Sequence, residues 1–234
     1  MIKVLPYAEP GAEAEIVAAG ATSSLVTRHS SLKLRRLGLV DYEPTWGAMQ
    51  RFTAERSPET PDEIWLLQHT PVYTYGVAGR PEHLPRAANG IPVIKVDRGG
   101  QVTYHGPGQW IAYLLLDLGR RGLTVRGLVR LLEQAVIDLA GDFGIAAAGR
   151  EDAPGVYVGA SKIAALGLRI RHGCSYHGLS LNVDMDLSPF RAIDPCGYPD
   201  LEVTQLRELG VVESMASVGD LLVSKLTQRL APAT

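Results

Sequence analysis

Cysteine is scarce in this 234-residue sequence, which contains only Cys174 and Cys196. Two distant cysteines do not make the disulfide framework of a small secreted domain. Long apolar runs are also missing, because the longest candidate, 110–116, ends at Asp117 and falls well short of the roughly 18 residues that span a membrane. Glu13 interrupts the N-terminal region before a signal-peptide core could form. We therefore expect a reduced, cytoplasmic protein with no membrane partner.

A basic excess is absent as well. The 23 Lys and Arg residues face 25 Asp and Glu residues, for a net charge of −2, so nucleic acid is not expected as a partner. A chain of this length can bury a core without disulfides or metals. Residues 1–33 are rich in Ala, Gly, Glu and Ser and show no sustained apolar period, which predicts a flexible N-terminal extension. We expect residues 34–234 to form a single domain.

Short apolar runs separated by Gly and Pro predict strands, and apolar residues at steps of three and four predict helices. A helix is expected from Pro44 to about Arg56, a second after an N-cap at Thr124, and a third after an N-cap at Ser217. This pattern predicts an α+β fold in two layers, with a mixed, largely antiparallel sheet and flanking helices. The expected strands cover 37–42, 64–67, 72–75, 93–96, 102–104 and 111–116, with two more in 156–183 around a turn at 171–173.

The densest candidate for chemistry is the segment Arg98-Gly99-Gly100-Gln101-Val102-Thr103-Tyr104-His105-Gly106-Pro107-Gly108-Gln109. Its four glycines allow close approach of the backbone to a ligand, and its histidine could move a proton near neutral pH. The arginine could pair with a phosphate or a carboxylate. A hairpin with a purely structural histidine explains the same residues equally well. The segment lacks the Gly-Lys-Ser/Thr of a P-loop and the glycine spacing of a dinucleotide fold.

Lys162 is a second candidate. If 162–170 is one regular strand, alternation places Lys162 on the apolar face with Ala164, Leu166, Leu168 and Ile170. Loss of hydration there would lower the pKa of its amine and make the lysine a candidate proton acceptor. The pattern equally allows a lysine at a strand end, with its stem on apolar surface and its amine in water.

The two cysteines differ in their surroundings. Cys174 opens an alternating apolar run and is expected to be a small buried side chain. Cys196 lies in Asp194-Pro195-Cys196-Gly197-Tyr198-Pro199, which favours an irregular loop, where functional groups are common. Its thiol would need a nearby cation for activation, and Lys162 is a candidate. His172, Cys174 and His177 are close in sequence, but a strand would not direct all three to one point, so no metal site is expected.

Taken together, these residues resemble the lipoyl(octanoyl) transferases of protein lipoylation. Lys162 and Cys196 are separated by 34 residues, as in that family, and the resemblance runs from about Leu37 to Leu209. His172 departs from the pattern, because a second arginine is common at its position. The matching motifs are Arg98-Gly99-Gly100, Thr103, His105, Gly108-Gln109, Tyr113, Lys162, an expected turn at Ala165-Leu166-Gly167, Gly178-Leu179-Ser180-Leu181-Asn182 and Pro195-Cys196-Gly197.

The resemblance implies a fold shared with biotin and lipoate protein ligases. It implies transfer of an octanoyl group from octanoyl-acyl carrier protein to a lysine of lipoyl domains, in 2-oxoacid dehydrogenase complexes and the glycine-cleavage carrier protein. Cys196 would be the nucleophile, and Lys162 would lower the pKa of its thiol. Either Lys162 or His105 would accept the proton of the attacking amine. The implied acyl site is lined by Arg98, Gly99, Gly100, Gln101, Val102, Thr103, Tyr104, His105, Ala165, Leu166, Gly167, Gly178, Leu179 and Ser180.

No cofactor is expected for this chemistry, because exchange between thioesters is nearly balanced in free energy and transfer from a thioester to an amine is downhill. A monomer is expected for a protein that docks small domains transiently. Two alternatives stay open: an ATP-dependent lipoate or biotin ligase on the same fold, and a carrier-binding module that has lost its chemistry. An intact Lys162 and Cys196 argue against the second.

Overall fold

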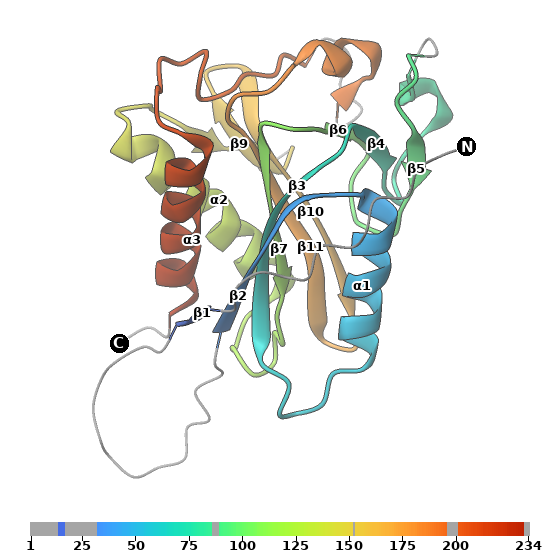
Figure 1. Cartoon of the computed structure of the whole chain (residues 1–234), viewed down its shortest axis with the longest axis vertical. Helices are drawn as coiled ribbons and strands as arrows, with labels where there is room; N and C mark the ends of the chain where they lie inside the picture. The colour runs from blue at the N-terminus through green and yellow to red at the C-terminus, as the bar shows by residue number, and fades with distance from the viewer. Residues whose placement is uncertain (1–13, 17–31, 86–88, 152, 196–200, 232–234) are drawn as a thin grey trace.

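A computed structural model describes residues 14–16, 32–85, 89–151, 153–195 and 201–231. Its centre is an eight-stranded sheet in the order β1-β2-β3-β7-β11-β10-β9-β8, in which β2 and β3 run parallel and all other neighbours run antiparallel. A three-stranded sheet in the order β5-β4-β6 stands at one end (Figure 1). The strands are β1 Ala14–Ile16, β2 Leu32–Val40, β3 Asp62–His69, β4 Val72–Tyr75, β5 Val93–Lys95, β6 Val102–His105, β7 Gln109–Leu115, β8 Ala148–Gly149, β9 Gly155–Val158, β10 Ser161–Arg171 and β11 Cys174–Asn182.

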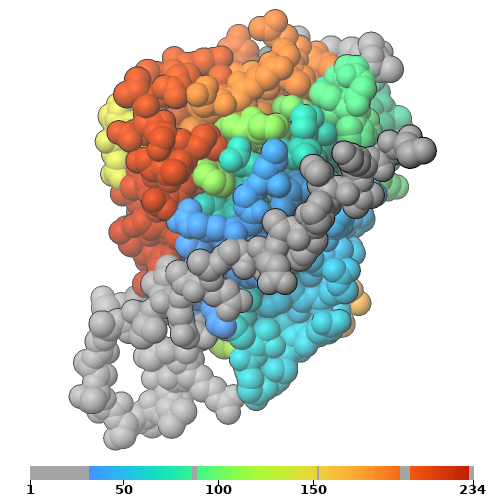
Figure 2. Space-filling model, viewed as in Figure 1, coloured from blue at the N-terminus to red at the C-terminus, as the bar shows by residue number. Residues whose placement is uncertain are grey.

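Helices cover both faces of the large sheet. Helices α2 (Val125–Asp142) and α3 (Met215–Leu230) pack on one face, and α1 (Tyr42–Ala54) packs on the other (Figure 1). In the space-filling view, β2 is visible between α3 on one side and α1 on the other (Figure 2). Alternation along β3 explains how both layers are held: Ile64 and Leu66 face α2 and α3, whereas Trp65 and Leu67 face α1. The expected α+β architecture is confirmed.

The helix starts test the expected capping residues. Thr124 is the N-cap of α2, as predicted, and its side chain accepts a hydrogen bond from the Gly127 amide. The N-cap of α3 is Ser214 rather than Ser217, and the Ser217 amide is the donor to it. The expected capping box placed the start of α3 one turn too late, because a serine three residues upstream offers the same oxygen. Helix α1 begins at Tyr42, so Pro44 lies in its first turn instead of at its first position.

The N-terminal strands start earlier than expected. Strand β2 begins at Leu32, five residues before the predicted strand, and β1 pairs with it antiparallel. Both β1 and the first residues of β2 fall in 1–33. The structure describes only 14–16 and 32–33 of that range, so the flexible extension remains a prediction.

Strands β10 and β11 form a long antiparallel hairpin within the large sheet. Its turn at 171–173 is confirmed, with His172 at φ 51° and Gly173 at φ 77°. The expected turn at 165–167 is wrong, because these residues lie inside β10 and pair with 178–180 of β11. Gly167 serves close packing within the strand, since a β-carbon there would lie 3.0 Å from Cδ of Arg98. In the described part of the chain, no helix is long and apolar enough to cross a membrane.

Candidate active site

A cavity lies where the small sheet meets the β10–β11 hairpin, with an empty volume of about 470 Å³ that includes its open mouth. It brings the glycine-rich segment, far earlier in the sequence, against the middle of β10 and the middle of β11. The lining residues are Tyr42, Arg98, Gly100, Gln101, Val102, Thr103, His105, Ile111, Tyr113, Ala165, Leu166, Gly167, His177, Gly178, Leu179 and Ser180. Two residues expected there, Gly99 and Tyr104, are not among them; Tyr104 packs instead against Tyr73 and Phe190.

The glycine-rich segment is fixed to the two sheets by its backbone and its arginine. The Gly99 amide donates to the carbonyl of Leu168 on β10 at 2.9 Å. Nη2 of Arg98 donates to both the carbonyl and the hydroxyl of Thr74 on β4, each at 2.8 Å. The guanidinium is buried, and its hydrogen bonds link β4 to the glycine-rich segment. This contact explains why an arginine accompanies the glycines.

Lys162 lines a second, smaller cavity that shares Thr103, Ala165 and Ser180 with the first. The predicted orientation of this lysine is wrong in one respect. A register shift between Lys162 and Ala164 breaks the alternation, so that Ile163 and Ala164 both enter the core under α2 and α3. Lys162 therefore lies on the opposite side, toward the cavity. Such a bulge re-aims a side chain, and periodicity alone does not reveal it.

The amine of Lys162 is enclosed, and the residue is only 3% exposed, which excludes the solvated alternative. Nζ donates to the carbonyl of Pro154 at 3.2 Å and lies 5.0 Å from the ring centroid of Tyr157. Gly155, at φ 148°, leaves room for it, since a β-carbon there would lie 3.1 Å from Nζ. A carbonyl and an aromatic face both favour a cation at this position.

The chain on both sides of Cys196 comes to this lysine. Pro195 and Val203 line the Lys162 cavity. The Lys162 amide donates to the carbonyl of Glu202, and the Thr204 amide donates to the carbonyl of Lys162, both at 2.9 Å. Cys196 itself lies outside the described residues.

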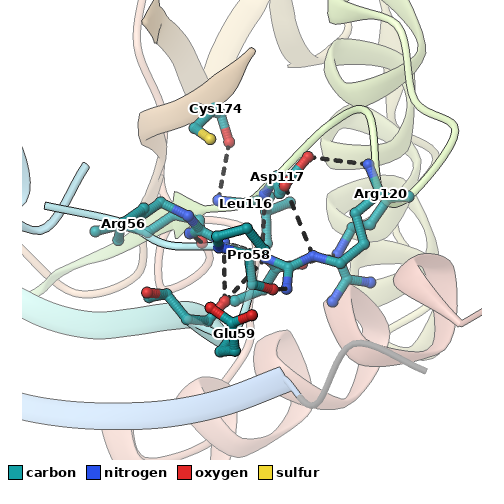
Figure 3. A network of polar contacts seen from close by, with 12 residues as sticks. Arg56, Pro58, Glu59, Leu116, Asp117, Arg120 and Cys174 are labelled. Atoms are coloured by element: carbon teal, nitrogen blue, oxygen red, sulfur yellow. Dashed lines mark hydrogen bonds and ion pairs between the residues drawn. The ribbon is translucent and has the colours of Figure 1, made fainter. Parts of the chain in front are cut away.

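Cys174 lies at the other end of the hairpin. It pairs with Arg171, nine residues along β10 from Lys162, which corresponds to about 30 Å of strand. It is buried, as expected, and burial raises the pKa of its thiol. Figure 3 shows it beside Leu116 and Asp117 in a polar network that includes Arg56 and Arg120. This cysteine therefore cannot act in the cavity that holds Lys162.

His105 lines the larger cavity and not the one that holds Lys162. Its Nδ1 lies 2.7 Å from Oε1 of Gln109, whose amide donates to Oδ1 of Asn182 at 2.9 Å. The Asn182 amide in turn donates to the carbonyl of Thr204. Burial lowers the pKa of His105 to about 3, so the imidazole is neutral over the physiological range. The histidine thus begins a chain of hydrogen bonds that ends at Thr204, whose amide donates to the carbonyl of Lys162.

Sequence reasoning missed three residues at the site: Tyr42, Asp97 and His177. Tyr42 and His177 line the cavity, and His177 is bound through Nε2 to Oδ1 of Asp97 at 3.0 Å. The Asp97 carboxylate also accepts from Trp46, Gln50 and Tyr176. These hydrogen bonds outweigh burial and hold the pKa of Asp97 well below its usual value. The one sequence signal was His177 inside an apolar strand, which had been considered only as a metal ligand. The described residues contain no metal-ligating cluster.

Comparison with known proteins shows which family this chain belongs to. Residues 41–227 match the lipoyl protein ligase A/B catalytic domain. An octanoyltransferase of Aromatoleum aromaticum is 61% identical over 86% of this chain and 87% of its own length. An octanoyltransferase of Laribacter hongkongensis is 60% identical over 86% of this chain and 96% of its own.

Solved structures share the fold at much lower identity. A bipartite lipoate protein ligase from Thermoplasma acidophilum is 18% identical, with a TM-score of 0.62 over 82% of each chain. The biotin protein ligase of Aquifex aeolicus is 13% identical, with a TM-score of 0.51 over 84% of this chain and 68% of its own. The expected kinship with lipoate and biotin ligases is confirmed at the level of the fold. By its family match and its close relatives, this chain belongs to the lipoyl protein ligase A/B catalytic domain family, among the octanoyltransferases.

Proposed function

We propose that this protein takes an octanoyl group from octanoyl-acyl carrier protein and passes it to a specific lysine of lipoyl domains, through a thioester on Cys196. Octanoyl transfer is the activity of its close relatives. The observation that carries the mechanism is the position of Lys162, which shares a cavity with Pro195, the residue bonded to Cys196. This cavity adjoins the larger one through common wall residues, so a reacting carbonyl could lie at Lys162 while its acyl chain occupies the larger cavity.

In the first half-reaction, the Cys196 thiolate attacks the carbonyl carbon of the donor thioester, the bond to the carrier sulfur breaks, and the carrier leaves as a thiol with a proton taken from the Lys162 ammonium. A free thiol is only a few per cent ionised at neutral pH, so it needs a cation that stabilises the thiolate. The buried ammonium of Lys162 is that cation in our proposal. Its enclosure strengthens the interaction, because few water molecules screen a charge inside a protein.

In the second half-reaction, the acceptor amine attacks the Cys196 thioester, an amide forms and the sulfur leaves. An alkyl amine has a reference pKa near 10.4, so it must lose a proton to attack. We assign that step to Lys162, which is neutral at this point because its proton left with the carrier thiol. His105 is the less suitable acceptor, because its pKa is about 3 and it lines the other cavity.

We further propose that the donor is a carrier-protein thioester and that the acceptors are the lipoyl domains of 2-oxoacid dehydrogenase complexes and of the glycine-cleavage carrier protein. Two bulky protein substrates cannot occupy one site together, and a covalent intermediate lets them bind in turn. Residues 34–234 would be the catalytic domain, acting as a monomer in the cytoplasm. No cofactor enters this scheme.

The test uses intact-mass spectrometry after incubation with octanoyl-acyl carrier protein, followed by peptide mapping. The wild type and Cys174→Ser are expected to gain one octanoyl group on the peptide that contains Cys196, and Cys196→Ser is expected to gain none. An adduct that persists in Cys196→Ser would refute the thioester assignment. Pyrophosphate release from ATP and free octanoate would instead indicate a ligase.

A further inference from the structure

One part of the lining of the larger cavity is a group of aromatic rings. Tyr42, Tyr113 and His177 line it, and none of the three is more than 4% exposed. The Tyr113 and His177 rings meet edge to face, with centroids 5.8 Å apart. The Tyr113 hydroxyl lies 2.7 Å from Nε2 of His69, which itself contacts Tyr42. These rings are therefore packed on several sides and cannot move aside freely.

His177 reaches this position through an unusual backbone. Regular alternation along β11 would place it with Leu179 and Leu181, which face α2 and α3. Its φ of 60° instead turns its ring to the side of Tyr176, and the two adjacent rings stack with centroids 5.1 Å apart. A positive φ is rare outside glycine and is energetically unfavourable for a residue that carries a β-carbon. Such strain inside a strand points to a local role for the side chain.

Asp97 holds the ring of His177 in one orientation. A carboxylate only accepts hydrogen bonds, so Nε2 of His177 carries the proton and Nδ1 carries a lone pair. Nδ1 is buried and has no hydrogen-bond partner among the described residues. Burial lowers the pKa of His177 and raises the pKa of Tyr42 and Tyr113, so all three rings are uncharged. They form a rigid wall without formal charge.

The register of the hairpin gives the distance to this wall. At the aromatic rings, His177 pairs with Leu168. At the Lys162 cavity, Ala165 pairs with Ser180, and these two residues line both cavities. Three residues of strand span about 10 Å. The seven carbon–carbon bonds of an extended octanoyl group span about 9 Å, at about 1.3 Å per bond along the chain. Two more carbons would add about 2.5 Å and would meet the rings.

We propose that Tyr42, Tyr113 and His177, with Asp97 as the positioning residue, form the inner end of the acyl site and limit the acyl chain to about eight carbons. This inference rests on the proposed function. It assigns chain-length selection to the turned side chain of His177, because that ring alone reaches the wall through a strained backbone.

The test compares acylation of the protein by hexanoyl-, octanoyl-, decanoyl- and dodecanoyl-acyl carrier protein, as kcat/KM from intact mass. In the wild type we expect decanoyl to react at least tenfold more slowly than octanoyl. His177→Gly removes the ring and suits the positive φ, and we expect it to raise the decanoyl-to-octanoyl ratio at least tenfold. His172→Gly is the matched control, since it replaces the other histidine with positive φ, exposed on the turn at the far end of the same hairpin.

Several outcomes overturn the proposal. One is a wild type that accepts dodecanoyl as readily as octanoyl, and another is an unchanged ratio in His177→Gly that still reacts with octanoyl. If His177→Gly does not fold, His177→Asn takes its place, because asparagine tolerates positive φ and is shorter than histidine. The decanoyl-to-octanoyl ratio of this variant must also rise, by a smaller factor. Failure of the wild type to react with any acyl donor would instead contradict the proposed function.

Discussion

The side-chain amine of Lys162 lies against the backbone of Gly155, where a β-carbon would come within 3.1 Å of Nζ and 3.0 Å of Cε. The backbone of Gly155 has a φ of 148°, which L residues rarely adopt. The amine of Lys162 therefore occupies the space that a side chain at position 155 would fill.

Gly155→Ala is expected to displace the Lys162 amine and to lower the rate of octanoyl transfer at least tenfold. Its backbone strain also lowers the free energy of unfolding by about 1–3 kcal/mol. Gly159→Ala is the matched control, because Gly159 has a φ of 60° with open space around it. Both variants are compared by transfer rate and by urea unfolding. Equal transfer rates in the two would contradict the proposed fit.

Asp62 is the fully buried carboxylate of the polar network at the end of the sheet near Cys174. It pairs with Arg56 at 2.5 Å, with Arg120 at 3.2 Å and with Arg121. Asp62→Asn leaves three guanidinium groups without their common counter-charge, and the expected loss is about 3–5 kcal/mol of unfolding free energy. Urea unfolding measures it.

The control for Asp62 is Asp220→Asn, which breaks an exposed ion pair with Arg36. Such a pair contributes at most about 1 kcal/mol. Because the Asp62 network lies far from Lys162, the folded Asp62→Asn protein is expected to keep its transfer rate at low temperature. A stability loss no larger than that of Asp220→Asn would show that the buried network is not a major source of stability.

The buried histidines predict a loss of stability in mild acid. Burial lowers the pKa of His69 to about 4 and that of His105 to about 3, against about 6.5 in the unfolded chain. Between these values the unfolded state binds more protons, so the free energy of unfolding falls as pH falls from about 6.5 toward 4. The slope reaches about 1.4 kcal/mol per pH unit for each group.

Urea unfolding at several pH values checks this slope. His69→Gln is expected to reduce the slope by about one group. A slope that is the same in wild type and His69→Gln would mean that His69 is not buried in its neutral form.

The N-cap of α3 offers a direct test of the helix start. Ser214→Ala removes the oxygen that accepts from the Ser217 amide and is expected to cost about 1 kcal/mol of unfolding free energy. Ser217→Ala, inside the first turn, is expected to change it by less than about 0.5 kcal/mol. The difference is read from urea midpoints. A larger loss at Ser217 would place the helix start where the sequence pattern put it.

Local sequence patterns predicted helix starts and turns correctly where only one nearby residue could fill the structural role. Thr124 caps α2 because its side chain can satisfy an amide of its own helix, and the turn at 171–173 forms because Gly173 accepts a positive φ. The same reasoning failed where two residues could fill one role, as with Ser214 and Ser217. The turn at 165–167 that the family resemblance implied is absent as well, because Gly167 serves close packing inside β10.

The sequence by itself determined the family, the α+β architecture and most of the residues that line the cavity, since motifs and apolar periods are properties of neighbouring residues. Only the tertiary structure decided how Lys162 and His177 are aimed. A bulge turns the first and a positive φ turns the second, and both depend on strands and loops from elsewhere in the chain. The separation of Cys174 from Lys162 likewise follows from hairpin register, because sequence distance says little about which end of a sheet a side chain occupies.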